Sequence, residues 1–239
     1  MRCFLPLAAV LVVTVTAPAC HAGDHEQDHR ILFFSGGDIS HISSFSWVGA
    51  DAALLDKRSV SGPVLRIDGG VGRYTYKTDE VEDGEVAGLV TQSEAMLGWR
   101  WVRPGLTLTA LAGPQVVNHI LSEDDPNNHD EGTHLGAVFA GDLWWEPRPD
   151  MVVAAAGNYG TARHTYYARV FGGMRPWSWL LAGPELVAFG NRQSDQQRLG
   201  LSVSANVTGT LCLKLSGGGL HGNGNRTGVY GTFGVDRLW

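Results

Sequence analysis

Apolar and polar residues alternate with a period of two along most of this 239-residue chain. In RLGLSVSANV, for example, Leu199, Leu201 and Val203 project to one side, whereas Arg198 and Ser202 project to the other. A β-strand presents successive side chains to opposite faces, so the pattern predicts strands. After the N-terminal segment, no stretch reaches the roughly 18 apolar residues that a membrane helix needs. We therefore expect an all-β protein.

The alternation divides the chain into about twelve strands with no internal domain break. The expected strands lie near residues 31–39, 44–54, 63–76, 86–101, 105–118, 133–146, 150–161, 164–175, 178–190, 195–206, 209–220 and 228–239. The fragments LAGPQ (111–115) and LAGPE (181–185) each fall within a strand. Because proline is tolerated in a sheet only at edges or bulges, these fragments predict two matched bulges.

The connections between the expected strands fall into two classes. Those after odd-numbered strands are polar, acidic or rich in Gly and Asn, such as KTDEVEDG, HILSEDDPNNHDEG, GNRQSD and HGNGNRT. Those after even-numbered strands are mostly short, such as RPG, EPRPD, RPWS and NVTG, although LDKRSVSG is longer. Long loops at one end and tight turns at the other are typical of outer-membrane barrels. An even strand number places both ends of the chain on the periplasmic side.

Tryptophan and tyrosine separate by strand end. Seven tryptophans fall near the ends with short turns: Trp99, Trp101, Trp144, Trp145, Trp177, Trp179 and Trp239. Trp47 falls toward the other end. All six tyrosines fall toward the long loops: Tyr74, Tyr76, Tyr159, Tyr166, Tyr167 and Tyr230. Amphipathic rings concentrate at the two interfaces of a bilayer, so this separation predicts two aromatic girdles.

The chain ends GVYGTFGVDRLW, an alternating stretch that finishes on an aromatic residue. Val229, Phe233 and Val235 lie on its lipid-facing side, and we expect Trp239 to close the girdle at the turn end. Arg237 shares that side and is expected to extend its charge toward the headgroups. The last strand should pair with the first, because an unpaired edge is too costly in lipid.

The N-terminus resembles a secretory signal. Arg2 is followed by the apolar run FLPLAAVLVVTV and by ACHA, which predicts cleavage after Ala22. An alternative is processing at Cys20 in TAPAC to give a lipidated N-terminus. We therefore expect a signal peptide over residues 1–22 and one barrel domain over residues 23–239. The predicted fold is an antiparallel up-and-down transmembrane β-barrel of about twelve strands, located in the cell outer membrane.

Charged residues recur on the side of the strands assigned to the lumen. They are Asp51, Arg66, Asp68, Glu94, Asp142, Glu185, Arg198, Lys214 and Asp236. Because a lone buried ion is costly, we expect opposite charges to pair in a polar interior. The alternative is a narrow polar passage, or a groove for a hydroxyl-rich glucan. Sugar sites usually combine carboxylates with aromatic platforms, and the expected position of the aromatics at the rims disfavours a groove.

Composition and motifs give no cofactor or metal site. The net charge of −6 and the absence of a dense Lys/Arg run disfavour a nucleic-acid partner. The loop SEDDPNNHDEG has five acids but lacks calcium-loop spacing, so we expect a solvated loop. GGGLHGNGN joins two expected strands, whereas a phosphate loop joins a strand to a helix.

Several segments, taken in order, resemble the cellulose biosynthesis protein BcsS family of Gram-negative bacteria. They are GGVGRYTY, SEAMLGWRW, LAGPQVVNHILSEDDPNN, LLAGPELVAFGNRQSDQQRLGLSVSA and SGGGLHGNGNRTGVYGTFGV, between about Phe33 and Val235. The resemblance implies an outer-membrane barrel associated with cellulose production. It implies no enzyme activity and no catalytic residues. The implied partners are outer-membrane lipid and lipopolysaccharide, with the cellulose chain or other components of the cellulose synthase complex.

Two alternatives of other classes stay open. A lipid A deacylase or acyltransferase would use His with Ser or Asp, and five histidines fall near the outer rim: His119, His129, His134, His164 and His221. No GxSxG elbow accompanies them. A second enzymatic alternative is glycoside hydrolysis, which would need two carboxylates about 5–9.5 Å apart, a spacing that several acids of a small barrel could satisfy. The other alternative is a small-solute pore or a surface adhesin.

Overall fold

The computed structural model describes residues 29–41, 43–78, 84–123, 125, 128, 131–191, 195–222 and 226–239. These residues form β1 (Ile31–Ser40), β2 (Ser43–Ala53), β3 (Gly62–Lys77), β4 (Glu85–Arg103), β5 (Leu106–Leu121), β6 (Gly132–Arg148), β7 (Met151–Gly160), β8 (Thr165–Trp177), β9 (Leu180–Gly190), β10 (Asp195–Asn206), β11 (Leu211–Gly222) and β12 (Arg226–Leu238). No helix within the described ranges is long and apolar enough to cross a membrane. The expected signal peptide, residues 1–22, lies outside the described residues.

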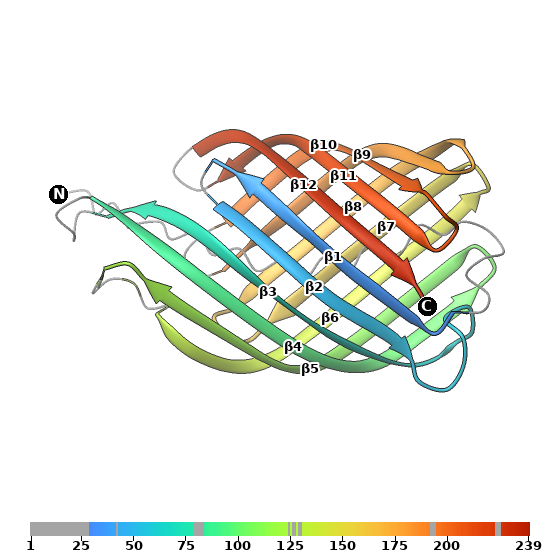
Figure 1. Ribbon diagram of the computed structural model, residues 1–239, viewed down its shortest axis with the longest axis horizontal. Coiled ribbons are helices and arrows are strands. Elements are labelled where there is room, and N and C mark those ends of the chain that lie inside the picture. The colour runs from blue at the N-terminus through green and yellow to red at the C-terminus, as the bar shows by residue number, and fades with distance from the viewer. Residues whose placement is uncertain are drawn as a thin grey trace.

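The twelve strands close into an antiparallel up-and-down barrel, as the alternation predicts (Figure 1). Each strand pairs with its neighbours in sequence, and β1 also pairs with β12. Every predicted strand boundary lies within three residues of the observed one. We call the end that carries the connections after odd-numbered strands the loop end. The opposite end, which holds the start of β1 and the C-terminus at the right of Figure 1, is the turn end.

The C-terminal residue completes the closure of the barrel. Leu32 of β1 is opposite Leu238 of β12, and the Trp239 carbonyl accepts hydrogen bonds from the amides of Arg30 (2.8 Å) and Ile31 (3.1 Å). The Trp239 amide donates to the Ile31 carbonyl at 2.8 Å. The predicted pairing of the last strand with the first is confirmed. A closed barrel satisfies its backbone groups within the sheet, which a strand in hydrocarbon requires.

The alternation separates an apolar outer wall from a polar interior. In β10, Leu201 is 67% exposed on the outside, whereas its neighbour Ser202 is 2% exposed inside. All nine charged residues assigned to the lumen point inward, so that prediction is confirmed. Because the outer wall is apolar and the barrel closed, the fold is that of an outer-membrane barrel.

The tryptophan girdle at the turn end is confirmed for six of its seven predicted members. The six exposed rings are Trp99, Trp101, Trp145, Trp177, Trp179 and Trp239. Arg237 lies over the Trp239 ring, 4.8 Å from its centroid, in agreement with its expected outward position. Trp144 is the exception, because it is buried inside the barrel. It lies at an even position in β6, on the same side as Asp142.

The prediction of a tyrosine girdle at the loop end is largely wrong. Tyr74, Tyr76, Tyr167 and Tyr230 are buried in the interior, and of the six tyrosines only Tyr159 is strongly exposed. The physical reason is the alternation itself, which places these rings on the lumen side of their strands. The rings therefore fill the barrel rather than line the bilayer interface.

The two AGP fragments interrupt strand pairing without a bulge. On β5, Gln115 is opposite Glu94 and Ala112 is opposite Leu97, so no residue is inserted across the fragment. The same holds on β9 between the pairs Phe171–Glu185 and Met174–Ala182, and the register shift of these two strands lies beyond Pro184, between Met174–Ala182 and Trp177–Leu180. The predicted bulges are therefore wrong, because a bulge shifts the register. Proline lacks an amide hydrogen, and the ladder lapses there locally.

Glycine at position 113 is required by a close approach of the neighbouring strand. A Cβ atom placed there would lie 1.9 Å from the carbonyl oxygen of Ala95. Gly113→Ala is therefore expected to lower the free energy of unfolding by about 1–3 kcal/mol, through forced backbone movement. Urea unfolding of the barrel in detergent measures this change.

Gly172→Ala provides the matched control, because a Cβ atom there meets nothing within 4 Å. Its expected effect is within about 0.5 kcal/mol. Equal unfolding midpoints for the two variants would contradict the steric argument.

Candidate functional site

The interior of the turn-end half is organised around one carboxylate. Asp51 of β2 accepts hydrogen bonds from Arg66 (3.0 Å), from Arg100 (2.7 Å) and from Arg58 of the β2–β3 connection. Arg66 also bonds Asp142 of β6 at 2.6 Å. Asp51 is opposite Arg66 in the register of β2 and β3, which explains why their side chains meet. The predicted pairing of opposite charges is confirmed for these residues, and the network joins β2, β3, β4 and β6 inside the barrel.

Two acids of the predicted lumen set differ from this pattern. Asp68 is opposite Glu94 in the register of β3 and β4, so two carboxyl groups are neighbours. Glu94 accepts hydrogen bonds from Gln92 and from Gln115 (2.7 Å), and both amides are buried. Neither Asp68 oxygen has a hydrogen-bond partner within the described chain. The expectation that opposite charges pair throughout is therefore wrong at this position.

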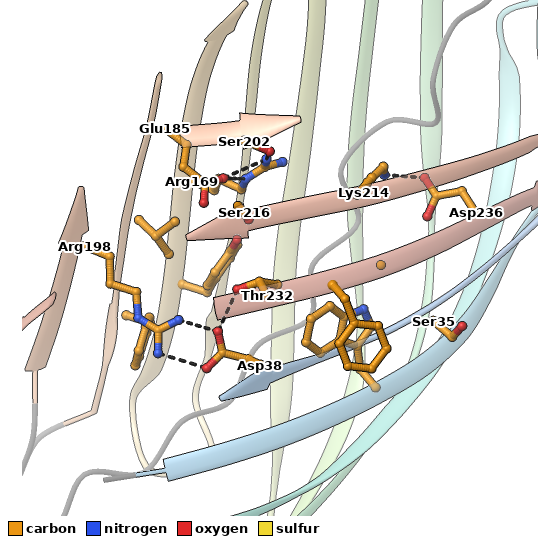
Figure 2. Close-up of a pocket in the computed structure, with 16 residues that line it drawn as sticks. Ser35, Asp38, Arg169, Glu185, Arg198, Ser202, Lys214, Ser216, Thr232 and Asp236 are labelled. Carbon is orange, nitrogen blue, oxygen red and sulfur yellow. Dashed lines mark hydrogen bonds and ion pairs between the residues drawn. The ribbon is translucent and has the colours of Figure 1, made fainter. Parts of the chain in front are cut away.

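A second ionic group joins β10 to the first and last strands, β1 and β12 (Figure 2). Arg198 bonds both oxygens of Asp38, one of them at 2.9 Å, and Thr232 donates to Asp38 at 2.8 Å. The Arg198 guanidinium lies 4.7 Å from the ring centroids of both Phe189 and Tyr230. Cation–π contacts and a bidentate carboxylate together hold this guanidinium in one position.

The remaining charges in Figure 2 are also paired. Arg169 bonds Glu185 at 2.8 Å and Ser202 at 3.2 Å, and Lys214 bonds Asp236. The cavity among these groups has a volume of about 50 Å³. A water needs about 10–15 Å³ by this measure, so the cavity has room for a few waters.

Aromatic and aliphatic side chains fill the interior of the loop-end half. The buried cluster consists of Phe34, Phe45, Trp47, Tyr74, Tyr76, Val86, Val90, Val117, Ala162, Tyr167, Val187 and Phe189. Its aromatic rings include the stacked pair Tyr74 and Tyr76, whose centroids are 6.3 Å apart. A packed cluster of this kind occupies the lumen as a core occupies a soluble domain.

Two residues of the loop SEDDPNNHDEG also contribute to the filling of the interior. Asp125 is buried and accepts a hydrogen bond from the Tyr76 hydroxyl at 2.9 Å, while Asn128 donates to the same hydroxyl at 2.8 Å. The expectation of a fully solvated loop is therefore wrong for these two residues. The physical reason is that the Tyr76 hydroxyl, buried in an apolar cluster, needs hydrogen-bond partners. The residues between them lie outside the described part of the chain.

A wide cavity opens at the turn end, with a volume of about 600 Å³. Its wall includes Trp144 and Glu146 at the end of β6 and Arg175 near the end of β8. Glu146 accepts hydrogen bonds from the Trp144 indole (2.8 Å) and from Arg175 (2.6 Å). Arg58 belongs both to this wall and to the Asp51 network, so the cavity borders the network. Among the described residues there is no group of three or more His, Cys, Asp or Glu suited to a metal ion.

The histidines that a lipid-modifying enzyme would use do not share one site. His119 is buried with its Nδ1 atom 3.3 Å from the Tyr74 hydroxyl, and His164 contacts the Tyr159 hydroxyl at 2.5 Å. His134 contacts the Glu131 carbonyl at 3.1 Å, and His221 is exposed. His129 lies outside the described residues. None of these contacts is the His–Ser or His–Asp pair of a catalytic triad.

Sequence reasoning missed the turn-end cavity and the inward position of Trp144. The available signal was the alternation, because Trp144 has the same parity as Asp142. The same parity argument would have placed Tyr74 and Tyr76 with Arg66 and Asp68 inside the barrel.

Solved structures with a similar fold are outer-membrane barrels. The transport unit of the autotransporter AIDA-I from Escherichia coli is 9% identical, has a TM-score of 0.51, and covers 91% of this chain and 92% of its own. The translocator domain of the autotransporter NalP from Neisseria meningitidis is 12% identical with a TM-score of 0.49, covering 88% of each chain. A KdgM porin is 10% identical with a TM-score of 0.46, covering 87% of this chain and 99% of its own. At these identities the AIDA-I likeness concerns the fold alone.

The family comparison covers the barrel from β1 to β12. No curated protein matches the chain. The family model described as cellulose biosynthesis protein BcsS matches residues 32–238. This range contains both interior ionic groups, the aromatic filling and the residues around the turn-end cavity. The chain therefore belongs to the cellulose biosynthesis protein BcsS family.

Proposed function

We propose that the protein is a non-catalytic accessory barrel of cellulose secretion, and that glucan does not pass through its lumen. The observation that supports this proposal is the filled interior. Ion pairs centred on Asp51 join β2, β3, β4 and β6 inside one half, and the aromatic cluster around Tyr74 and Tyr76 occupies the other. A protein of this kind acts through its two ends rather than as a conduit.

The size of the interior space supports the same proposal. The cavity of about 50 Å³ beside Arg198 and Asp38 holds a few waters. Pockets for small ligands measure about 300–1,000 Å³, so a sugar ring does not fit there without movement of the buried ion pairs. The breaking of such pairs is costly, because each leaves a buried charge without compensation.

The orientation follows the general pattern of outer-membrane barrels. Long polar loops face the outside of the cell, and short turns face the periplasm. Export by cleavage of residues 1–22 is part of this proposal, with residues 23–239 as the mature chain. The turn end would then face the periplasm, where other components of the cellulose synthase complex are accessible.

A deletion strain tests this function. Loss of the gene is expected to lower the amount of cellulose at the cell surface, while synthase activity in isolated inner membranes stays unchanged. Surface cellulose measured by dye binding, compared with glucan synthesis by washed membranes, separates secretion from polymerisation. Complementation with the intact gene is the control.

Two other results would each contradict a part of the proposal. A normal polysaccharide phenotype in the deletion strain would remove the assignment to cellulose. Altered lipid A acylation in that strain would favour the enzyme alternative, and His119, His129, His134 and His164 would be the first positions to substitute.

A further inference from the structure

The turn-end cavity has the dimensions of a ligand site. Its volume of about 600 Å³ is within the range of about 300–1,000 Å³ that small-molecule sites occupy. Residues from four connections or strand ends surround it, among them Ser59, Val102, Thr107, Asp150 and Ser178. A wall assembled from four parts of the chain encloses a ligand on several sides.

Two charged groups of this wall, Glu146 and Arg175, are held in position by hydrogen bonds. Glu146 receives hydrogen bonds from the Trp144 indole and from Arg175, at 2.8 and 2.6 Å. Arg175 also donates to the Pro149 carbonyl at 3.0 Å. Side chains that are already ordered lose little entropy when a ligand binds, which favours affinity.

The balance of charge favours a neutral ligand over an anion. Arg58, Arg103 and Arg175 contribute positive charge, and Glu146 and Asp150 contribute negative charge. Two of these cations are already paired, since Arg58 bonds Asp51 and Arg175 bonds Glu146. An anionic ligand would have to compete with carboxylates that are built into the protein.

The same groups suit a chain of hydroxyl groups. A hydroxyl both donates and accepts, so it can bond a carboxylate and a guanidinium in the same site, and such charge-assisted bonds are the stronger kind. The apolar parts of Val102, Leu106 and Pro149 supply contact area for the C–H faces of a sugar ring. A lipid chain, in contrast, would offer no hydrogen bonds to the polar groups that it covers.

We propose that this cavity binds a short segment of a neutral, hydroxyl-rich polysaccharide of the β-glucan class. The inference rests on the proposed function and names a ligand for the barrel's turn end. Arg58 lines the cavity and pairs with Asp51, so the cavity borders the ion pairs of the interior. The glucan segment docks in the mouth and does not cross the barrel.

The test is isothermal titration of the purified full-length barrel in detergent with cellohexaose. The intact protein is expected to bind, and Glu146→Gln is expected to bind about tenfold more weakly, because a charged hydrogen-bond acceptor is lost. Ser178→Trp, which introduces a large side chain at the cavity wall, should also bind at least about tenfold more weakly by steric exclusion. Heat-dependent gel mobility confirms that each variant is folded.

The matched control is Glu131→Gln, the same chemical change at the loop end. It is expected to bind cellohexaose as the intact protein does. Wild-type affinity in both Glu146→Gln and Ser178→Trp would overturn the proposal, as would tighter binding of hexagalacturonate, an anionic sugar, than of cellohexaose. The absence of any binding by the intact protein would also overturn it, while the accessory function would still stand on the deletion phenotype.

Discussion

Asp51→Asn is expected to lower the free energy of unfolding of the barrel by about 3–5 kcal/mol, the cost of breaking a buried ion pair. Asp51 is 1% exposed and is the shared acceptor of Arg58, Arg66 and Arg100. An amide carries no negative charge and accepts fewer hydrogen bonds. The substitution would therefore leave three guanidinium groups around one site without their shared carboxylate, although Arg66 would keep its pair with Asp142. Urea unfolding in detergent, followed by tryptophan fluorescence, measures the change.

Asp150→Asn is the control for this prediction. Asp150 pairs with Arg148 at the turn end, where the two side chains are 52% and 60% exposed. Exposed pairs contribute about 0–1 kcal/mol, so a small change is expected. Similar unfolding curves for the two variants would show that the Asp51 network adds little to stability.

The period-two pattern was sufficient to predict the strands and the face of each residue. Asp51 and Arg66 were both assigned to the lumen, and the register brings them opposite each other. The pattern does not give the depth of a residue or its partners across the barrel. The contacts from Arg58 and Arg100 to Asp51 therefore had no signal in the sequence, because one arises from a connection and the other from a strand that is not a neighbour of β2.

The tyrosines show how one rule can override another. The preference of aromatic rings for the bilayer interface placed Tyr74 and Tyr76 by strand end alone. Their parity with Arg66 and Asp68 placed them in the lumen, and the structure agrees with the parity. Parity is fixed by the geometry of the strand, whereas interface preference is a statistical tendency.

The turn-end cavity could not be predicted for a different reason. It is formed by residues that are distant in sequence, such as Arg58, Trp144 and Arg175, and whose relative positions depend on barrel closure. The positions of the short turns in the sequence place each of these residues near the turn end of the barrel. They do not predict which side chains meet there. The shape of the turn-end cavity depends on side-chain packing, which the alternation of apolar and polar residues does not encode.

Trp47→Ala is expected to lower the free energy of unfolding by about 3–5 kcal/mol, because it removes a large ring from a packed interior. Trp47 is 6% exposed, and its ring stacks with Phe45 at a centroid distance of 6.5 Å. A Cβ atom at Gly36 would lie 2.4 Å from the same ring, which shows how closely the wall approaches it. The substitution would leave a cavity that such rigid neighbours fill only in part.

Trp101→Ala separates loss of a core ring from loss of a tryptophan in general. Trp101 is 44% exposed on the outer wall at the turn end, so its removal creates no interior cavity. The free energy of unfolding of Trp101→Ala should therefore fall by less than half as much as that of Trp47→Ala, as measured by urea unfolding in the same detergent. A larger loss for Trp101→Ala would mean that the outer girdle, and not the filled lumen, dominates the stability of this barrel. The argument that glucan is excluded from the lumen would then lose its energetic basis, because a weakly packed interior could open at low cost.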